Sequence, residues 1–143
     1  MVGAGRPLAP VFGPWENSCS REEETMIDHV AIPVRDLEAS RRFYDPVFEG
    51  LGAKVVMEFP GLVLFGTDDG MVALRESEQV APMHIAFKAD RSGVESFYET
   101  ALAAGGSDNG PPGTRTEYHE NYYAAFVTDP NGHNIEAVCH KPA

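Results

Sequence analysis

The feature that most constrains this chain is an internal repetition. The segment HVAI at residues 29–32 is echoed by HIAF at residues 84–87, about 55 positions later. A Phe-Tyr pair follows each segment, at residues 43–44 and again at residues 97–98. Self-similarity at a long, nearly fixed interval indicates a duplicated structural unit. We therefore expect one domain built from two related halves.

The first half begins with a predicted strand at residues 26–34. Its alternating pattern places His29 and Ala31 on one face and apolar residues on the other. Asp36 is a good helix N-cap, and the apolar helical pattern that follows runs toward the stop signal at residues 50–52. Pro46 lies inside this pattern, so we expect a kink or a break into two short helical turns there. Three further strands are predicted at residues 53–59, 62–66 and 71–75, giving the order βαβββ.

The second half repeats the opening strand and helix. Residues 83–89 alternate with His84 and Ala86 on one face, and Asp90 or Ser92 can cap a helix that ends at residues 105–106. Residues 107–120 are rich in Gly, Pro and polar side chains, which predicts a long functional loop. A hairpin is expected from strands at residues 122–128 and 133–138 around a turn at 129–132. The predicted fold class is α+β.

Residues 1–25 differ in composition from the rest of the chain. They are rich in Gly and Pro and are expected to form a disordered leader, so the folded domain is assigned to residues 26–143. The segment lacks the continuous apolar core of a secretion signal. Cys19 and Cys139, the only cysteines, offer no disulfide framework. We therefore expect a cytoplasmic protein.

The charge of the chain limits its partners. Twenty-two acidic residues against 11 basic residues give a formal net charge of −11, which repels nucleic acid and anionic membrane surfaces. No apolar run is long enough to span a bilayer. A small molecule is therefore the expected partner, with no nucleic acid and no membrane.

Three side chains carry the predicted chemistry. His29 and His84 occupy equivalent places in the repeat, and Glu136 lies between Ile135 and Ala137 on the last predicted strand. Taken singly, a strand histidine is more often a hydrogen-bonded core residue, and a strand glutamate is usually solvated. The repeated position of the histidines favours a metal site instead. Two imidazoles and one carboxylate leave coordination positions open for a substrate or oxygen.

From residue 26 onward the sequence resembles the vicinal oxygen chelate superfamily. This superfamily contains glyoxalase I, fosfomycin-resistance thiol transferases, bleomycin-resistance proteins and type I extradiol dioxygenases. The matching motifs are DHVA at residues 28–31, HIAF at 84–87 and DPNGHNIE at 129–136. The resemblance implies paired βαβββ modules forming a curved mixed sheet around a metal cleft. It also implies a divalent metal (Zn, Fe, Mn, Ni or Co) on His29, His84 and Glu136, and a homodimer in which the ligands come from one chain or from both.

The leading functional hypothesis is a metal-dependent glyoxalase-like enzyme, of the lyase or isomerase type. It would act on a small molecule that chelates the metal through vicinal oxygens. The sequence departs from glyoxalase I where that enzyme has a fourth ligand, because the equivalent position falls on Ala73 or Leu74. An Fe(II)-dependent extradiol dioxygenase is one alternative. A metal-free ligand-binding protein, similar to bleomycin-resistance proteins, is the other.

A polar and aromatic cluster precedes the second-to-last strand. His119 is the predicted catalytic acid or base beside Glu136, with an exposed loop histidine as the alternative. Arg115 could neutralise an anionic group of the substrate or form a surface salt link. His133 and His140 are assigned no role. The cluster around His119 consists of Tyr118, Glu120, Tyr122 and Tyr123.

Overall fold

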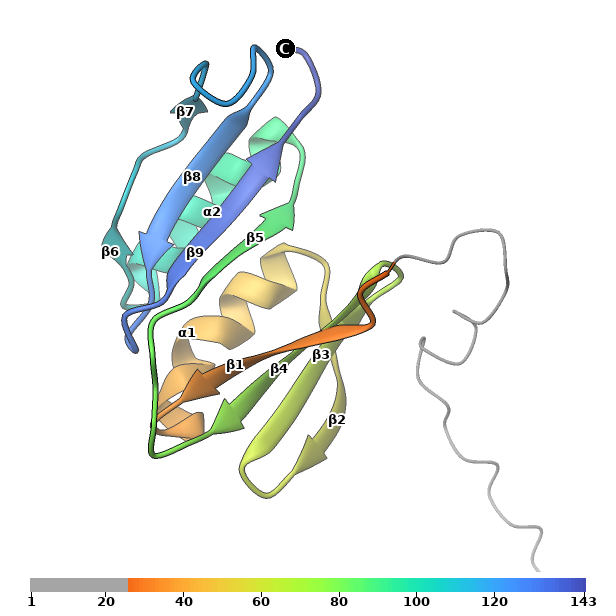
Figure 1. The fold of residues 1–143 in the computed structure, drawn as a ribbon, viewed down its shortest axis with the longest axis vertical. Coiled ribbons are helices and arrows are strands. Elements are labelled where there is room, and N and C mark those ends of the chain that lie inside the picture. The colour runs from red at the N-terminus through yellow and green to blue at the C-terminus, as the bar shows by residue number, and fades with distance from the viewer. Residues whose placement is uncertain (1–25) are drawn as a thin grey trace, which may run out of the picture.

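The order of helices and strands confirms the repetition (Figure 1). The computed structural model describes residues 26–143, so the expectations for residues 1–25 lie outside the described residues. The first half contains β1 (His29–Val34), α1 (Leu37–Gly50), β2 (Lys54–Phe59), β3 (Leu62–Thr67) and β4 (Gly70–Glu76). The second half contains β5 (His84–Lys88), α2 (Arg91–Ala103), β6 (Ser107–Asp108), β7 (Gly113–Thr114), β8 (Tyr123–Thr128) and β9 (Asn134–Cys139).

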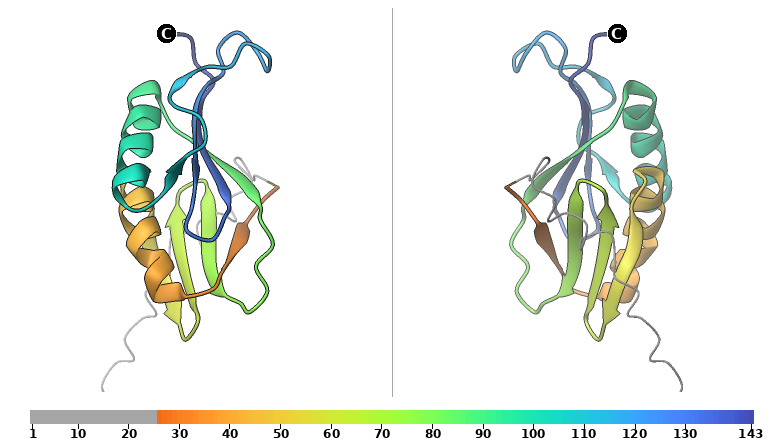
Figure 2. Two further views of the ribbon diagram at one scale, coloured as in Figure 1. Left: turned by 90° about the vertical axis from the view of Figure 1, so that its left-hand side faces the viewer. Right: turned by 90° about the vertical axis from the view of Figure 1, so that its right-hand side faces the viewer.

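The strands form two mixed sheets, and this confirms the predicted α+β class. The first sheet has the order β1-β4-β3-β2, and the second has β5-β9-β8-β6, with β7 also pairing with β8. In each sheet the opening strand of the half pairs in parallel with its last strand, so that His29 lies opposite Met71 and His84 opposite Asn134. Both helices lie on the same side of the strands, which leaves the opposite faces without a helix (Figure 2).

Each helix begins where an aspartate caps it. Asp36 accepts a hydrogen bond from the Ala39 amide at 2.9 Å, as predicted. At the second helix the sequence left two candidates, and Asp90 is the N-cap, accepting from the Gly93 amide at 2.7 Å. The two caps fix the points at which the chain turns from β1 and β5 into the helical layer.

The predicted break at Pro46 is wrong, because α1 is one continuous helix of 14 residues. Proline removes one backbone donor from a helix. Large apolar side chains on both sides of Pro46, including Phe43 and Phe48, are fully buried against the strands. This burial offsets the lost hydrogen bond and keeps the helix intact through Pro46.

The prediction of one long loop at residues 107–120 is also wrong in part. The segment runs along β8 and forms the two short strands β6 and β7. Between β6 and β7 the Asn109 amide donates to the Phe126 carbonyl at 3.0 Å, and the Phe126 amide donates to the Gly110 carbonyl at 2.8 Å. Strands of two residues are too short to show an alternating pattern, so only the pairing with β8 reveals them.

A single apolar core joins the two halves. The ring of Phe48 on α1 lies 4.8 Å from the ring of Phe65 on β3 and 5.4 Å from the ring of Phe87 on β5. From α2, Val94, Phe97 and Ala101 are buried in the same cluster. The relative position of the two sheets is therefore set by packing around the helices.

Buried hydrogen bonds reinforce this junction. The Tyr44 hydroxyl of α1 donates to the Asp129 carboxylate at 2.5 Å. His133, which is fully buried, accepts from the Met83 amide through Nδ1 at 3.0 Å. Its Nε2 atom therefore carries the proton and donates to the Pro33 carbonyl at 2.6 Å. His133, to which the sequence assigned no role, thus links the end of β1 to the second half.

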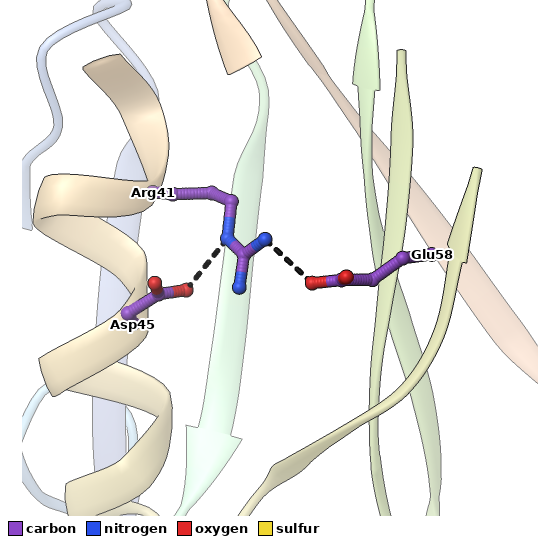
Figure 3. Close-up of polar contacts among 3 residues, drawn as sticks. All are labelled: Arg41, Asp45 and Glu58. Atoms are coloured by element: carbon purple, nitrogen blue, oxygen red, sulfur yellow. Dashed lines mark hydrogen bonds and ion pairs between the residues drawn. The ribbon is translucent and has the colours of Figure 1, made fainter. Parts of the chain in front are cut away.

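An ion-pair bridge holds the edge strand β2 against α1 (Figure 3). The guanidinium of Arg41 contacts Asp45 on its own helix at 3.1 Å and Glu58 on β2 at 2.6 Å. Edge strands have one unpaired side, so a side-chain link to the helix helps to fix their position.

Candidate metal centre

The predicted alternation places both histidines on the faces without helices. On β5, His84 and Ala86 are exposed, whereas Ile85 and Phe87 pack against the core. On β1, His29 is exposed in the same way. The outward position of each histidine is a property of the strand, because successive side chains point to opposite faces.

Glu136 is the buried charge of the second sheet. Its residue is only 1% exposed, and in the register of β9 it lies between Ala86 on β5 and Phe126 on β8. The Oε2 atom lies 2.9 Å from His84 Nε2, and the Oε1 atom accepts a very short hydrogen bond from the Tyr122 hydroxyl. Within residues 26–143, His84 is the only basic group that forms an ion pair with this carboxylate.

The protonation of His84 follows from its other contact. The Nδ1 atom lies 3.1 Å from the Asn134 carbonyl, which can only accept, so Nδ1 carries a proton. The other ring nitrogen, Nε2, then points at Glu136 Oε2. The 2.9 Å contact between these two atoms is satisfied by a proton on one of them or by a metal ion bound by both.

These donors fit a divalent metal ion. Neighbouring ligands of an octahedral ion with bonds of about 2.1 Å lie about 3.0 Å apart, close to the separation of His84 Nε2 and Glu136 Oε2. Metal-binding histidines usually donate their second ring N–H to a carbonyl or carboxylate, which orients the ring. His84 does this toward Asn134, and His29 does it toward Asp28, with Nδ1 2.6 Å from the carboxylate. Each histidine therefore has Nε2 as the ring nitrogen that could bind a metal ion.

His29 is not part of the His84–Glu136 cluster. No group of three or more His, Cys, Asp or Glu side chains among residues 26–143 is close enough to hold a metal ion. His29 belongs to the first sheet, whereas His84 and Glu136 belong to the second. The described chain thus brings together two of the three predicted ligands.

The predicted catalytic His119 belongs to an aromatic cluster beside Glu136. Its Nδ1 atom accepts from the Asn121 amide at 3.0 Å, so Nε2 carries a proton and donates to His140 Nδ1 at 2.7 Å. The Tyr122 ring packs edge-on against both imidazoles, with centroids 5.4 Å from His119 and 5.2 Å from His140. Tyr122 therefore connects the histidine pair to Glu136. No sequence signal marked His140, because it follows the end of β9.

The Tyr122 hydroxyl is a stable hydrogen-bond donor. Burial, followed by the hydrogen bond and charge of Glu136, raises the pKa of Tyr122 to about 12. The hydroxyl is therefore protonated at neutral pH and holds Oε1, while Oε2 faces His84. The sequence placed Tyr122 in the cluster near the cleft but did not indicate this contact.

The position of the missing fourth ligand can now be assigned. Ala73 on β4 lies opposite Ala31 on β1 and Leu64 on β3, on the face that carries His29. Leu74 points into the core and is fully buried. Ala73 therefore occupies the place that the resemblance assigns to the additional carboxylate, and it offers no donor atom.

A cavity of about 1140 Å³ lies between the two halves, and neither His84 nor Glu136 is among its lining residues. It extends from the start of β1 to β5 and has a mainly apolar lining that includes Phe48, Phe65, Met71 and Ile85. No helix in residues 26–143 is both long and apolar enough to cross a membrane.

Comparison with known proteins identifies the family to which this geometry corresponds. The family described as Glyoxalase/Bleomycin resistance protein/Dioxygenase superfamily matches residues 26–137. A crystal structure of a glyoxalase/bleomycin resistance protein from Albidiferax ferrireducens superposes with a TM-score of 0.73 at 27% identity, covering 80% of this chain and 98% of that chain. The match thus extends over nearly all of the described residues.

Two further structures extend the comparison. The fosfomycin resistance protein FosX from Mesorhizobium loti has a TM-score of 0.63 at 25% identity, covering 83% of this chain and 94% of that chain. A lactoylglutathione lyase from Agrobacterium tumefaciens has a TM-score of 0.63 at 23% identity, covering 80% and 93% of the two chains, which supports the fold alone.

Proposed function

Because the chain belongs to the Glyoxalase/Bleomycin resistance protein/Dioxygenase superfamily, we propose that it is a metal-dependent glyoxalase-like enzyme. Its substrate is a small molecule that chelates the metal through vicinal oxygens. The observation that carries the proposal is the contact between His84 Nε2 and the buried Glu136 carboxylate at 2.9 Å. A bridging proton or a metal ion satisfies this contact, and each side chain is oriented by a second hydrogen bond, from His84 to the Asn134 carbonyl and from the Tyr122 hydroxyl to Glu136.

His29 completes the proposed ligand set from a second copy of the chain. Within residues 26–143 it is held on a different sheet from His84 and Glu136, with its Nε2 atom directed away from the Asp28 contact. Neither sheet has a helix on its outer face (Figure 2). The first sheet of one subunit can therefore pack against the second sheet of its partner. In a two-fold dimer such an exchange forms two equal sites.

The residues of the chain have separable tasks in this proposal. A divalent ion, whether Zn, Fe, Mn, Ni or Co, would supply Lewis-acid stabilisation of an enolate or alkoxide. Glu136 balances its charge, and Tyr122 keeps one carboxylate oxygen fixed. His119 is the proposed proton-transfer group, acting along its hydrogen bond to His140.

Metal analysis of purified and reconstituted protein tests the core of the proposal. We expect about one divalent ion per chain in the wild type, and its loss in Glu136→Gln and His84→Ala. His84 is exposed and Glu136→Gln keeps the shape of the side chain, so the fold should persist in both variants. If the reconstituted wild type binds no divalent ion, the proposal is wrong and the metal-free ligand-binding alternative replaces it.

A mixing experiment tests the shared site. The variants His29→Ala and Glu136→Gln are each expected to bind no metal as homodimers. After subunit exchange, half of the dimers are mixed and hold one intact site, which restores about one quarter of the wild-type sites. If all ligands come from one chain, mixing restores nothing.

Extradiol dioxygenase activity is the second candidate. Two histidines and one carboxylate with open positions also suit Fe(II) and oxygen, and Ala73 leaves the site without a fourth protein ligand. Oxygen uptake by the Fe(II)-loaded protein with catechol would favour this activity over the glyoxalase-like one.

A further inference from the structure

Arg115 is a cation that has no carboxylate partner within the described residues. No ion pair within residues 26–143 includes it, although acidic side chains outnumber basic ones two to one in the chain. Its NH2 group donates to the Pro111 carbonyl at 2.6 Å, and its backbone amide donates to the Tyr122 carbonyl at 2.7 Å. The surface salt link expected as one alternative from the sequence is therefore not formed with any residue in the described part of the chain.

The guanidinium lies beside the candidate metal centre. Its central carbon is 5.6 Å from the centroid of the Phe126 ring. Phe126 is the direct neighbour of Glu136 across β8 and β9, and its ring stacks at 6.2 Å from the ring of His84. Phe126 therefore forms an aromatic surface between the His84–Glu136 pair and Arg115.

The loop before β8 is shaped to hold this guanidinium. A Cβ atom at Gly113 would lie 2.8 Å from Arg115 NH1, which is too close without a shift. A Cβ atom at Gly110 would lie 3.0 Å from the Phe126 ring and 3.3 Å from Arg115 NH2. The two glycines thus leave room for an arginine whose guanidinium lies over the phenylalanine ring, which is a favourable cation–π arrangement.

We propose that Arg115 and Phe126 form a subsite for an anionic oxygen group of the substrate. An arginine fork presents five N–H donors, and within residues 26–143 the Arg115 side chain makes only one hydrogen bond, to the Pro111 carbonyl. The remaining donors suit a carboxylate or a phosphonate. The favoured substrate is a small acid whose vicinal oxygens reach the metal and whose planar or apolar middle part lies on Phe126.

This inference rests on the proposed function. Affinities of related ligands for the wild type and its variants test the inference independently of that function. The probes are catechol and 3,4-dihydroxybenzoate, which share the chelating oxygens and differ in the carboxylate. Their affinities are measured by calorimetry on the Zn-loaded wild type, Arg115→Gln and Arg115→Lys. Arg42→Gln, an exposed change of the same charge on α1, is the matched control.

The ratio of the two affinities is the decisive quantity, because the intrinsic difference between the probes cancels between proteins. We expect the preference for the acid to fall about tenfold in Arg115→Gln, to recover in part in Arg115→Lys and to be unchanged in Arg42→Gln. A third probe, 3,4-dihydroxyphenylphosphonate, shows which anion is preferred.

An unchanged ratio in Arg115→Gln, with both probes bound, would overturn the anion subsite and leave the proposed function intact. Failure of the wild type to bind zinc or, after reconstitution, any other divalent ion would instead overturn the proposed function together with the subsite. Zinc content measured before the titrations separates the two results.

Discussion

The Tyr122 hydroxyl donates its hydrogen bond to Glu136 Oε1, the carboxylate oxygen that does not face His84. The other side of the Tyr122 ring is packed by His119 and His140. The carboxylate is therefore held in one orientation before any ligand arrives. Such preorganisation increases affinity because the ordering cost is already met by the fold.

Replacement of Tyr122 by phenylalanine should loosen this carboxylate without disturbing the packing. Outer hydrogen bonds to metal ligands usually contribute about 10- to 100-fold in affinity, so we expect a loss of that order for zinc. Calorimetric zinc titration measures the change. Tyr118→Phe is the control, because that ring also contacts Tyr122 but lies 63% exposed. Equal losses in the two variants would show that the hydroxyl contact with Glu136 is unimportant.

Removal of the Asp28 carboxylate should also weaken metal binding, because this carboxylate orients the ring of His29. Asp28→Ala leaves His29 Nδ1 without its acceptor at 2.6 Å and frees the ring to rotate. We expect zinc affinity to fall about tenfold. Asp68→Ala removes the same charge from an exposed turn and serves as the control. A matching decrease in both variants would indicate a general electrostatic effect and would contradict the assigned role.

The contact between Tyr44 and Asp129 should give the protein a specific alkaline sensitivity. Burial, together with the charge and hydrogen bond of Asp129, raises the pKa of Tyr44 above its ordinary value of 10.0. Above that pH the unfolded chain loses a proton that the folded protein keeps. The stabilisation is thus complete below pH 10.0 and is lost as the pH rises, with a slope approaching about 1.4 kcal/mol per pH unit.

Urea unfolding of the wild type and Tyr44→Phe between pH 8 and pH 11 measures this effect. The variant should be less stable at pH 8 by about 1–3 kcal/mol, because the Oδ2 atom of the buried Asp129 loses its donor. The difference between the two proteins should then shrink above pH 10.0. A constant difference across the whole range would contradict the role of Tyr44.

His133 should prove to be a structural residue and not a ligand. His133→Ala leaves the Pro33 carbonyl and the Met83 amide without their buried partner, and we expect a loss of about 2–5 kcal/mol in the free energy of unfolding. His140→Ala, at an exposed position, should cost less than about 1 kcal/mol. Folded His133→Ala protein should retain its zinc stoichiometry. Loss of zinc from folded protein would show that His133 belongs to the site.

The local geometry of this protein follows from short patterns in its sequence. Strand alternation places His29 and His84 outward because side chains on a strand alternate between two faces. Asp36 and Asp90 start the helices because a short carboxylate can bind free amides in the first turn. These features depend on neighbours within a few residues. Because the sequence repeats after about 55 positions, the same strand and helix pattern could be predicted in both halves.

Only the tertiary structure decided which distant groups meet. The contacts of Glu136 with Tyr122, of His119 with His140 and of Arg115 with Phe126 depend on strand register and loop path, which no short pattern encodes. The same holds for the continuity of α1 through Pro46, where core burial outweighs a local helix-breaking preference. The placement of His29 on a separate sheet from His84 and Glu136 is likewise a result of packing between the halves, because identical strand patterns do not specify which sheet faces converge.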